Sequence, residues 1–306
     1  MDFTLTQEQV ALATAVDGLA AQFQQKPIEF RGFALASDAL DEALAGAEFF
    51  DIATTPGLGP VAAALTVERL ARLPYTAEVA LSMLLRPHLQ GGQGGQGGQL
   101  PRPLAYVERG RPGRFVASAK TLLIAEGEQL SVARVSGDAL QPVASIYAYP
   151  MGRLTRAVDA QPLAASEAAE ARKWLRIALA AEAAGLMQAA IDATVEHLSV
   201  RKQFGRPLGT FQALRHRLSE CAVLAGGVKH LAVKAAGTAA EGDAALAAFH
   251  AQESTNRVCY DLHQMLGTMG MTLEHPLHLW TYRLKLLLSE LGGQGAQAEA
   301  VVQHCF

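Results

Sequence analysis

A long alanine-rich stretch from residue 167 to residue 200 constrains this chain more than any other feature. It is apolar on most sides, so it predicts a helix buried inside a bundle rather than one lying on a surface. Three later segments, within residues 214–231, 255–266 and 276–291, repeat apolar residues at steps of three and four, which predicts three more helices. Four such helices can close around one core, so we expect residues 162–306 to form a four-helix bundle.

The rest of the chain divides into three further parts. Residues 1–89 carry helical apolar patterning and predict an N-terminal helical domain. Residues 90–102 begin with Gln-Gly-Gly repeats, which cannot hold a packed conformation and therefore predict a Gly/Gln-rich linker. Residues 103–161 contain short apolar or alternating runs separated by glycines, which predict a small antiparallel sheet. The expected fold is mainly α with a small, reduced β-domain in the middle.

Composition narrows the classes of function. Half of the 306 residues are hydrophobic, so the chain can bury a sizeable core, and its net charge of −3 argues against nucleic-acid and membrane-surface partners. The start of the chain lacks an export leader, and we expect no stretch that is apolar enough to span a membrane. The three cysteines lie far apart and the histidines lack His–Glu–His spacing, so we expect no metal site, no disulfide framework and a cytoplasmic location.

The most informative string is RKQFGRPLGTFQ, which runs from Arg201 to Gln212 directly after the long helix. Its glycines and its proline force a turn, so it presents Arg201, Phe204 and Gln212 together between two helices. A guanidinium suits a pyrophosphate, an aromatic ring suits an adenine face, and a side-chain amide can hydrogen-bond to either. The alternative is an ordinary helix–helix turn with a solvated arginine.

A second string, HQMLGTMGMTLEHP, occupies residues 263–276, about fifty residues after Gln212. Gly267 and Gly270 in this string would let the backbone approach a ligand closely. Gln264 stands beside them as a further hydrogen-bonding group. The string therefore predicts a second contact site in the same bundle.

Both strings resemble signatures of the acyl-CoA dehydrogenase family, flavoenzymes that oxidise fatty-acyl thioesters. The resemblance implies a fold with an N-terminal helical domain, a central β-domain and a C-terminal four-helix bundle. It also implies that Arg201, Phe204 and Gln212, with Gln264 and Gly267, contact the ADP half of an FAD shared at a subunit interface. Thr268 departs from the family pattern, because a second glycine is usual at that position.

The chemistry of that family needs a carboxylate that removes a Cα proton while a hydride leaves Cβ for the flavin. The resemblance places this base at Leu291, just before a glycine, or in a minority branch at Leu175. Two neighbouring carboxylates are weak candidates for a relocated base. Glu290 lies one step from the first position, which turns its side chain by about 100° around a helix. Glu182 lies two turns beyond the second and is expected to be structural.

The segments that cradle the isoalloxazine ring in catalytic family members are also not visible between residues 86 and 135. Our leading hypothesis is a non-catalytic subunit of a heterotetrameric acyl-CoA dehydrogenase, in which a second subunit carries the catalytic Glu. By resemblance, such assemblies act on acyl-CoA, often CoA thioesters of steroid side chains, with electron-transfer flavoprotein as a candidate acceptor. Two alternatives remain: a self-sufficient FAD enzyme that uses Glu290 or Glu182 as its base, and a flavin-free scaffold subunit.

Overall fold

The computed structural model describes residues 4–26, 35–89 and 99–306. Most of the predicted Gln-Gly-Gly linker lies outside these residues. Within its described residues, the N-terminal part contains four α-helices, α1 (Gln7–Ala20), α2 (Asp38–Gly46), α3 (Gly59–Ala71) and α4 (Ala80–Leu84). Helix α1 begins with a capping box, because the Thr6 hydroxyl accepts from the Gln9 amide and the Gln9 side chain accepts from the Thr6 amide.

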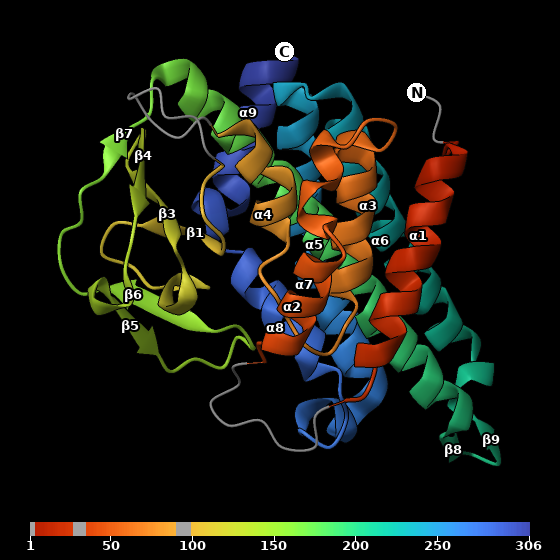
Figure 1. The fold of residues 1–306 in the computed structure, drawn as a ribbon. Coiled ribbons are helices and arrows are strands. Elements are labelled where there is room, and N and C mark those ends of the chain that lie inside the picture. The colour runs from red at the N-terminus through yellow and green to blue at the C-terminus, as the bar shows by residue number, and fades with distance from the viewer. Residues whose placement is uncertain (1–3, 27–34, 90–98) are drawn as a thin grey trace.

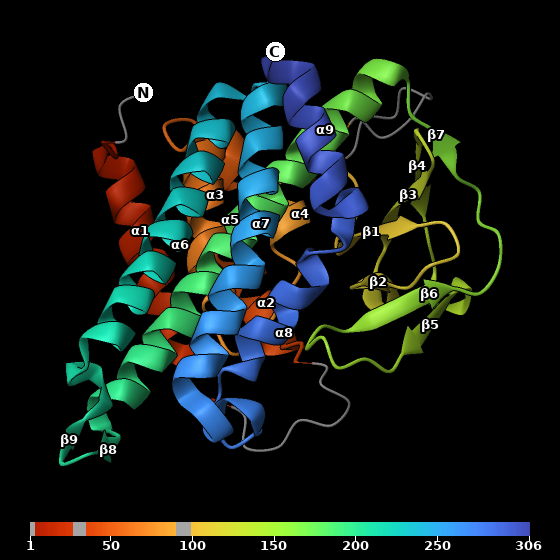
Figure 2. The same ribbon diagram turned by 180° about the vertical axis from the view of Figure 1, so that it is seen from behind.

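The C-terminal part is built around α5 (Ala165–Val200), the 36-residue helix that the sequence predicted. Helices α6 (Gln212–Thr238) and α7 (Glu241–Leu266) pack beside it, with α3 on another side (Figures 1 and 2). Gly185 allows α3 to come close, because a Cβ atom there would lie 2.0 Å from the carbonyl oxygen of Glu68. The mainly α fold with a small β-domain is as predicted.

One membrane expectation needs correction. By length and hydropathy alone, α5 is apolar enough to cross a membrane, and it is the one such helix among the residues that the structure describes. However, 89% of its most apolar 18-residue window is buried inside the protein. The apolar character of α5 is therefore that of the core helix of a bundle.

The fourth predicted helix is interrupted, so the expectation of one stripe running to Leu291 is wrong. Helix α8 (His278–Leu287) ends before a 3₁₀ turn at Glu290–Gly292, and α9 (Gly293–Cys305) follows. Leu291 has a left-handed backbone, with φ 56°. The side-chain amide of Gln252 donates to the carbonyl oxygens of Leu287 and Glu290, which satisfies two groups that the break exposes.

The β-domain contains two small sheets rather than one antiparallel sheet. The first has the order β1 (Leu104–Glu108), β3 (Thr121–Glu126), β4 (Gln129–Arg134) and β7 (Gln161–Pro162), and β1 pairs with β3 in parallel. The second is antiparallel and has the order β2 (Gly113–Arg114), β6 (Met151–Leu154) and β5 (Leu140–Val143).

Alternating side chains of the four-stranded sheet enter two different cores. Leu123 and Leu130 join the main core with the helices, whereas Leu122 and Ile124 join a second core with the three-stranded sheet. The alternation follows from the two-residue period of a strand. The four-stranded sheet therefore lies between the bundle and the three-stranded sheet, beside the helices as Figure 1 shows.

Candidate functional site

The RKQFGRPLGTFQ string forms a short hairpin that projects from the end of the bundle (Figure 2). Strand β8 (Lys202–Gln203) pairs with β9 (Arg206–Pro207) through a turn at Phe204 and Gly205. Both turn residues have left-handed backbones, with φ of 54° and 78°, as a two-residue type I′ hairpin requires. The Phe204 side chain is 86% exposed, so its ring is available for a stacking contact.

The predicted polar residues of this string are exposed beside the hairpin. Arg201 caps the end of α5, and its carbonyl accepts from the Leu208 amide at 2.8 Å, which leaves its guanidinium at the surface. Gln212 is the first residue of α6 and is also exposed. Because no side-chain hydrogen bond caps α6, its first amides and its dipole are available to an anion.

The second string forms the connection between α7 and α8, at the same end of the bundle as the hairpin (Figures 1 and 2). Gln264 and Gly267 are exposed and line a surface groove of about 380 Å³ with Tyr260, Met271 and others. A Cβ atom on Gly267 would meet nothing within 4 Å, so this glycine faces open space.

Gly270 differs from the expectation that both glycines face a ligand. A Cβ atom on Gly270 would lie 2.9 Å from the carbonyl oxygen of His263. The His263 ring also makes a 2.7 Å hydrogen bond with the Gly270 carbonyl. Gly270 is therefore needed for close packing of the turn onto its own helix.

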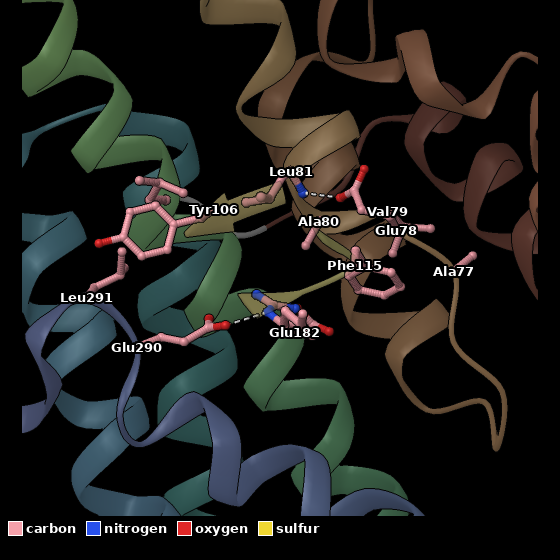
Figure 3. A pocket seen from close by; sticks show the side chains of 12 residues that line it. Ala77, Glu78, Val79, Ala80, Leu81, Tyr106, Phe115, Glu182, Glu290 and Leu291 are labelled. Atoms are coloured by element: carbon pink, nitrogen blue, oxygen red, sulfur yellow. Dashed lines mark hydrogen bonds and ion pairs between the residues drawn. The ribbon is translucent and has the colours of Figure 1, made fainter. Parts of the chain in front are cut away.

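The two positions that the resemblance assigned to the base, Leu175 and Leu291, meet at one pocket. Leu175 is 3% exposed on α5, and Leu291 lies in the turn before α9. Tyr106 lies with Leu291 on one side of the pocket and Phe115 lies on the other (Figure 3). The enclosed volume is about 10 Å³, which is room for about one water molecule. Both base positions thus carry apolar side chains in a closed pocket.

The two candidate carboxylates, Glu182 and Glu290, are brought together by a buried arginine. Arg114 of β2 donates through Nη1 to Glu182 at 2.5 Å and through Nε to Glu290 at 2.7 Å. The Tyr149 hydroxyl donates to the other oxygen of Glu182 at 2.7 Å. Figure 3 shows Glu290 and Glu182 at the base of the pocket, and its dashed line from the Glu290 carboxylate marks the bond donated by Arg114. We call Arg114, Tyr149, Glu182 and Glu290 the Arg114 cluster.

Burial and charge act in opposite directions inside this cluster. Burial opposes the charge of Arg114, but Glu182 and Glu290 outweigh it and hold the pKa of this arginine well above its ordinary value. Burial raises the pKa of Glu290, although Arg114 acts to lower it. Burial, followed by the charge of Glu182, raises the pKa of the Tyr149 hydroxyl. Arg114 is therefore the fixed cation that both carboxylates face.

An open cleft of about 650 Å³ leads toward the closed pocket and shares Tyr106, Leu175 and Leu291 with it. The cleft lies between the four-stranded sheet and helices α5 and α9. Its charged lining is balanced, with four arginines and four glutamates: Arg109, Arg111, Arg172, Arg176, Glu108, Glu126, Glu128 and Glu299. In the described parts of the chain, no group of three or more His, Cys, Asp or Glu side chains could hold a metal ion.

Comparison with known proteins assigns the bundle. Residues 166–304 match the family model described as "Acyl-CoA dehydrogenase, C-terminal domain". The four-helix bundle is therefore similar to the C-terminal domain of acyl-CoA dehydrogenases. It is 31% identical over 207 residues to acyl-CoA dehydrogenase FadE34 of Mycobacterium tuberculosis, which is 63% of this chain and 29% of that protein. It is 35% identical over 107 residues to acyl-CoA dehydrogenase IpdE2 of the same organism, covering 35% of this chain and 34% of that protein.

The matches therefore span about a third of the length of these curated relatives. Solved structures agree along nearly the whole chain. The ChsE4–ChsE5 complex from Mycobacterium tuberculosis matches with a TM-score of 0.73 and 23% identity, covering 100% of this chain and 99% of that chain. The Tcur3481–Tcur3483 steroid ACAD G363A variant matches with a TM-score of 0.78 and 22% identity, covering 99% and 98%. At these identities the likeness establishes the acyl-CoA dehydrogenase fold.

Sequence reasoning missed Arg114 and Tyr149. Both belong to the β-domain, and Arg114 lies 68 residues before Glu182 and 176 before Glu290. No acyl-CoA dehydrogenase motif surrounds them. The one available signal was an arginine placed between Gly113 and the apolar run that begins at Phe115. A single charged residue at that point is equally typical of the edge of a turn, so it does not indicate a buried arginine.

Proposed function

We propose that this chain is a non-catalytic subunit of a heteromeric, FAD-dependent acyl-CoA dehydrogenase. In this proposal it supplies contacts to the ADP half of an FAD held at a subunit interface, and a partner subunit carries the catalytic Glu. One contrast carries the proposal. The ADP-side residues are exposed at one end of the bundle, whereas both base positions are leucines that line a closed pocket.

The exposed end fits an ADP group. Phe204 offers an open ring to an adenine, and base–aromatic stacking of this kind contributes about 1–3 kcal/mol. Arg201 and the N-terminus of α6 at Gln212 suit the pyrophosphate, through a guanidinium fork and helix amides. The groove at Gln264 and Gly267 combines an amide with backbone that a ligand can approach.

The pocket beside the β-domain does not fit an isoalloxazine ring. Ligand pockets commonly enclose about 300–1,000 Å³, whereas about 10 Å³ remains among Leu175, Leu291, Tyr106 and Phe115. The arrangement also counts against the self-sufficient enzyme. A base must reach a substrate proton, and Glu182 and Glu290 both face inward onto Arg114.

Within the assembly, FAD would accept the hydride and the partner's Glu would accept the proton. The role of this chain is to hold the nucleotide tail, which fixes the position of the reactive ring against the acyl-CoA thioester. A steroid side-chain thioester as substrate, electron-transfer flavoprotein as acceptor and a cytoplasmic location belong to the same proposal. The names of the structural neighbours support the steroid class and a two-protein assembly.

Co-expression with the partner subunit tests the proposal. The chain purified alone should be colourless, and the co-purified complex should carry FAD and oxidise acyl-CoA. In that complex, Arg201→Ala and Phe204→Ala should each lower the FAD content, whereas Arg153→Ala, at an exposed arginine of β6, should not. A yellow homo-oligomer that oxidises acyl-CoA unaided would contradict the proposal.

The two alternatives give different results in the same experiment. If either carboxylate were the base, Glu290→Gln or Glu182→Gln would abolish activity of the chain alone. If the chain were a flavin-free scaffold, Arg201→Ala would leave the FAD content of the complex unchanged.

A further inference from the structure

The Arg114 cluster sits where the second sheet of the β-domain meets the bundle. The four-stranded sheet is held by apolar side chains such as Leu104 and Leu123, which belong to the main core. The three-stranded sheet lies on its far side and reaches the bundle at one corner, formed by Arg114, Phe115 and Tyr149. This corner therefore contacts the bundle in two ways, through the apolar side chain of Leu286 on α8 and through the buried charges around Arg114.

The backbone fixes this corner so that Arg114 points inward. Phe115 has a left-handed backbone with φ 60°, and its amide donates to the Pro150 carbonyl at 2.7 Å. A Cβ atom on Gly113 would lie 2.7 Å from the Tyr106 carbonyl oxygen, so β2 lies tightly against β1. The rings of Phe115 and Tyr149 pack edge to face at 5.6 Å. The corner is therefore a preformed unit that presents one cation.

The bundle presents the matching anions from two separate elements. Glu182 comes from the middle of α5, and Glu290 comes from the turn between α8 and α9. Arg114 is 7% exposed, and its two donor groups reach one carboxylate each. Without this guanidinium, the buried carboxylate of Glu182 and the mostly buried carboxylate of Glu290 would lose the cation that contacts both, and each would repel the other. The buried Arg283 also interacts electrostatically with Glu182, but its side chain donates to the carbonyls of Leu73 and Leu279.

We propose that Arg114 is a charged latch that docks the corner of the three-stranded sheet onto the bundle and thereby keeps this chain's own pocket closed. The open cleft of about 650 Å³ ends at Leu175, Leu291 and Tyr106, which also line the closed pocket. Phe115 forms the opposite wall and moves with Arg114, its neighbour in the chain. Release of the latch therefore joins the cleft to the pocket.

Hydrogen–deuterium exchange of the isolated chain tests this latch. Arg114→Met keeps much of the side-chain length but removes the charge. We expect exchange at least tenfold faster in residues 113–119 and 148–154, with residues 121–134 unchanged, and a melting temperature lower by about 10 °C. Arg153→Met is the matched control, because Arg153 lies on β6 of the same sheet and contacts Gln141 at the surface. It should exchange like the wild type.

Two more variants separate charge from bulk. In the triple variant Arg114→Met, Glu182→Gln, Glu290→Gln, no buried charge of the cluster is left unpaired, so slow exchange should return at the corner. Arg114→Lys keeps the charge but lacks the fork that reaches both carboxylates, so its exchange should be intermediate.

If residues 113–119 and 148–154 of Arg114→Met exchanged at the wild-type rate, the latch proposal would be wrong. It would also be wrong if these residues exchanged as fast in the triple variant as in Arg114→Met. Should Arg114→Met fail to fold, the comparison of Arg114→Lys with the triple variant decides on the same grounds. The measurement needs neither FAD nor a partner subunit. Its failure would therefore leave the proposed cofactor sharing untouched.

Discussion

Two regions along the α5 core helix make opposite use of similar residues. At its C-terminal end, Arg201 and Phe204 are exposed, and the Phe204 ring meets only the edge of Phe211 at 6.0 Å among the ring contacts of the described residues. Beside its middle, Arg114 and Phe115 are buried, and the arginine is saturated by two carboxylates. Phe115 and Phe204 even share a left-handed backbone. The two regions differ in burial. The first is an exposed surface that another molecule can contact, and the second is a pocket whose space is filled by side chains of this chain.

The largest expected effect is the loss of stability in Phe115→Ala, for which Phe204→Ala is the comparison. Phe115→Ala should destabilise the protein by about 3–5 kcal/mol, because it removes a ring that is 5% exposed in a packed core. Phe204→Ala should change stability by less than about 0.5 kcal/mol. It should instead weaken FAD binding in the complex about fivefold or more, through lost stacking. Chemical denaturation and FAD titration measure the two effects. Equal destabilisation by both variants would break the comparison.

A carboxylate returned to the base position should not restore chemistry. Leu175→Glu should cost about 2–3 kcal/mol, because a buried carboxyl whose pKa rises by about two units loses that much. The isolated chain should stay inactive toward acyl-CoA, since the pocket has no room for a flavin ring. Gln212→Glu, at the exposed start of α6, is the control for added charge and should not destabilise. Dehydrogenase activity in the isolated Leu175→Glu chain would contradict the proposed function.

A smaller effect concerns the pH dependence of stability. Burial raises the pKa of Glu290 above its ordinary value of 4.5, with Arg114 opposing and Glu182 and Glu108 reinforcing the rise. The native state then keeps a proton that the unfolded state loses. Stability contributed by this group is present below pH 4.5 and is lost as the pH rises through the native pKa. Glu290→Gln should remove this part of the slope in unfolding measured from pH 4 to 8. An unchanged slope would show that Glu290 does not titrate differently on folding.

The last effect is expected near the exposed end, and it is confined to acid pH. Burial, followed by the charges of His197 and Lys26, lowers the pKa of His275 from 6.5 to about 4. The unfolded state therefore takes up a proton first, and stability is lost as the pH falls from about 6.5 to about 4. His275→Gln should flatten part of this acid limb, read as melting temperature against pH. If the melting temperature of His275→Gln fell with pH as steeply as that of the wild type, the loss of stability at acid pH would come from other groups.

The sequence predicted what short-range pattern determines. The α5 helix and the turns at Phe204 and Gly267 each follow from residues within one continuous string, although the pairing of β8 with β9 at the first turn was not predicted. The parallel pairing of β1 with β3 and the separation into two sheets could not be predicted in that way, because strand partners are set by tertiary contacts.

The Arg114 cluster was out of reach for the same reason. Its members come from four places in the chain and carry no shared motif. Glu182 and Glu290 could be named as acids, but not as counter-ions of one arginine. The break at Leu291 was hidden as well, because its apolar spacing continues the stripe of α8 while the following glycines permit the turn.

Helix α7 connects the α8–α9 turn beside the Arg114 cluster with the surface groove at Gln264. Gln252 holds the carbonyls of Leu287 and Glu290, and Gln264, about 18 Å further along the same rod, faces the surface groove. A helix resists stretching, so axial displacement at one end is transmitted to the other. Any movement of α7 along its length, such as one imposed by an assembling neighbour, therefore shifts the anchor of the α8–α9 turn and the groove-lining amide of Gln264 together.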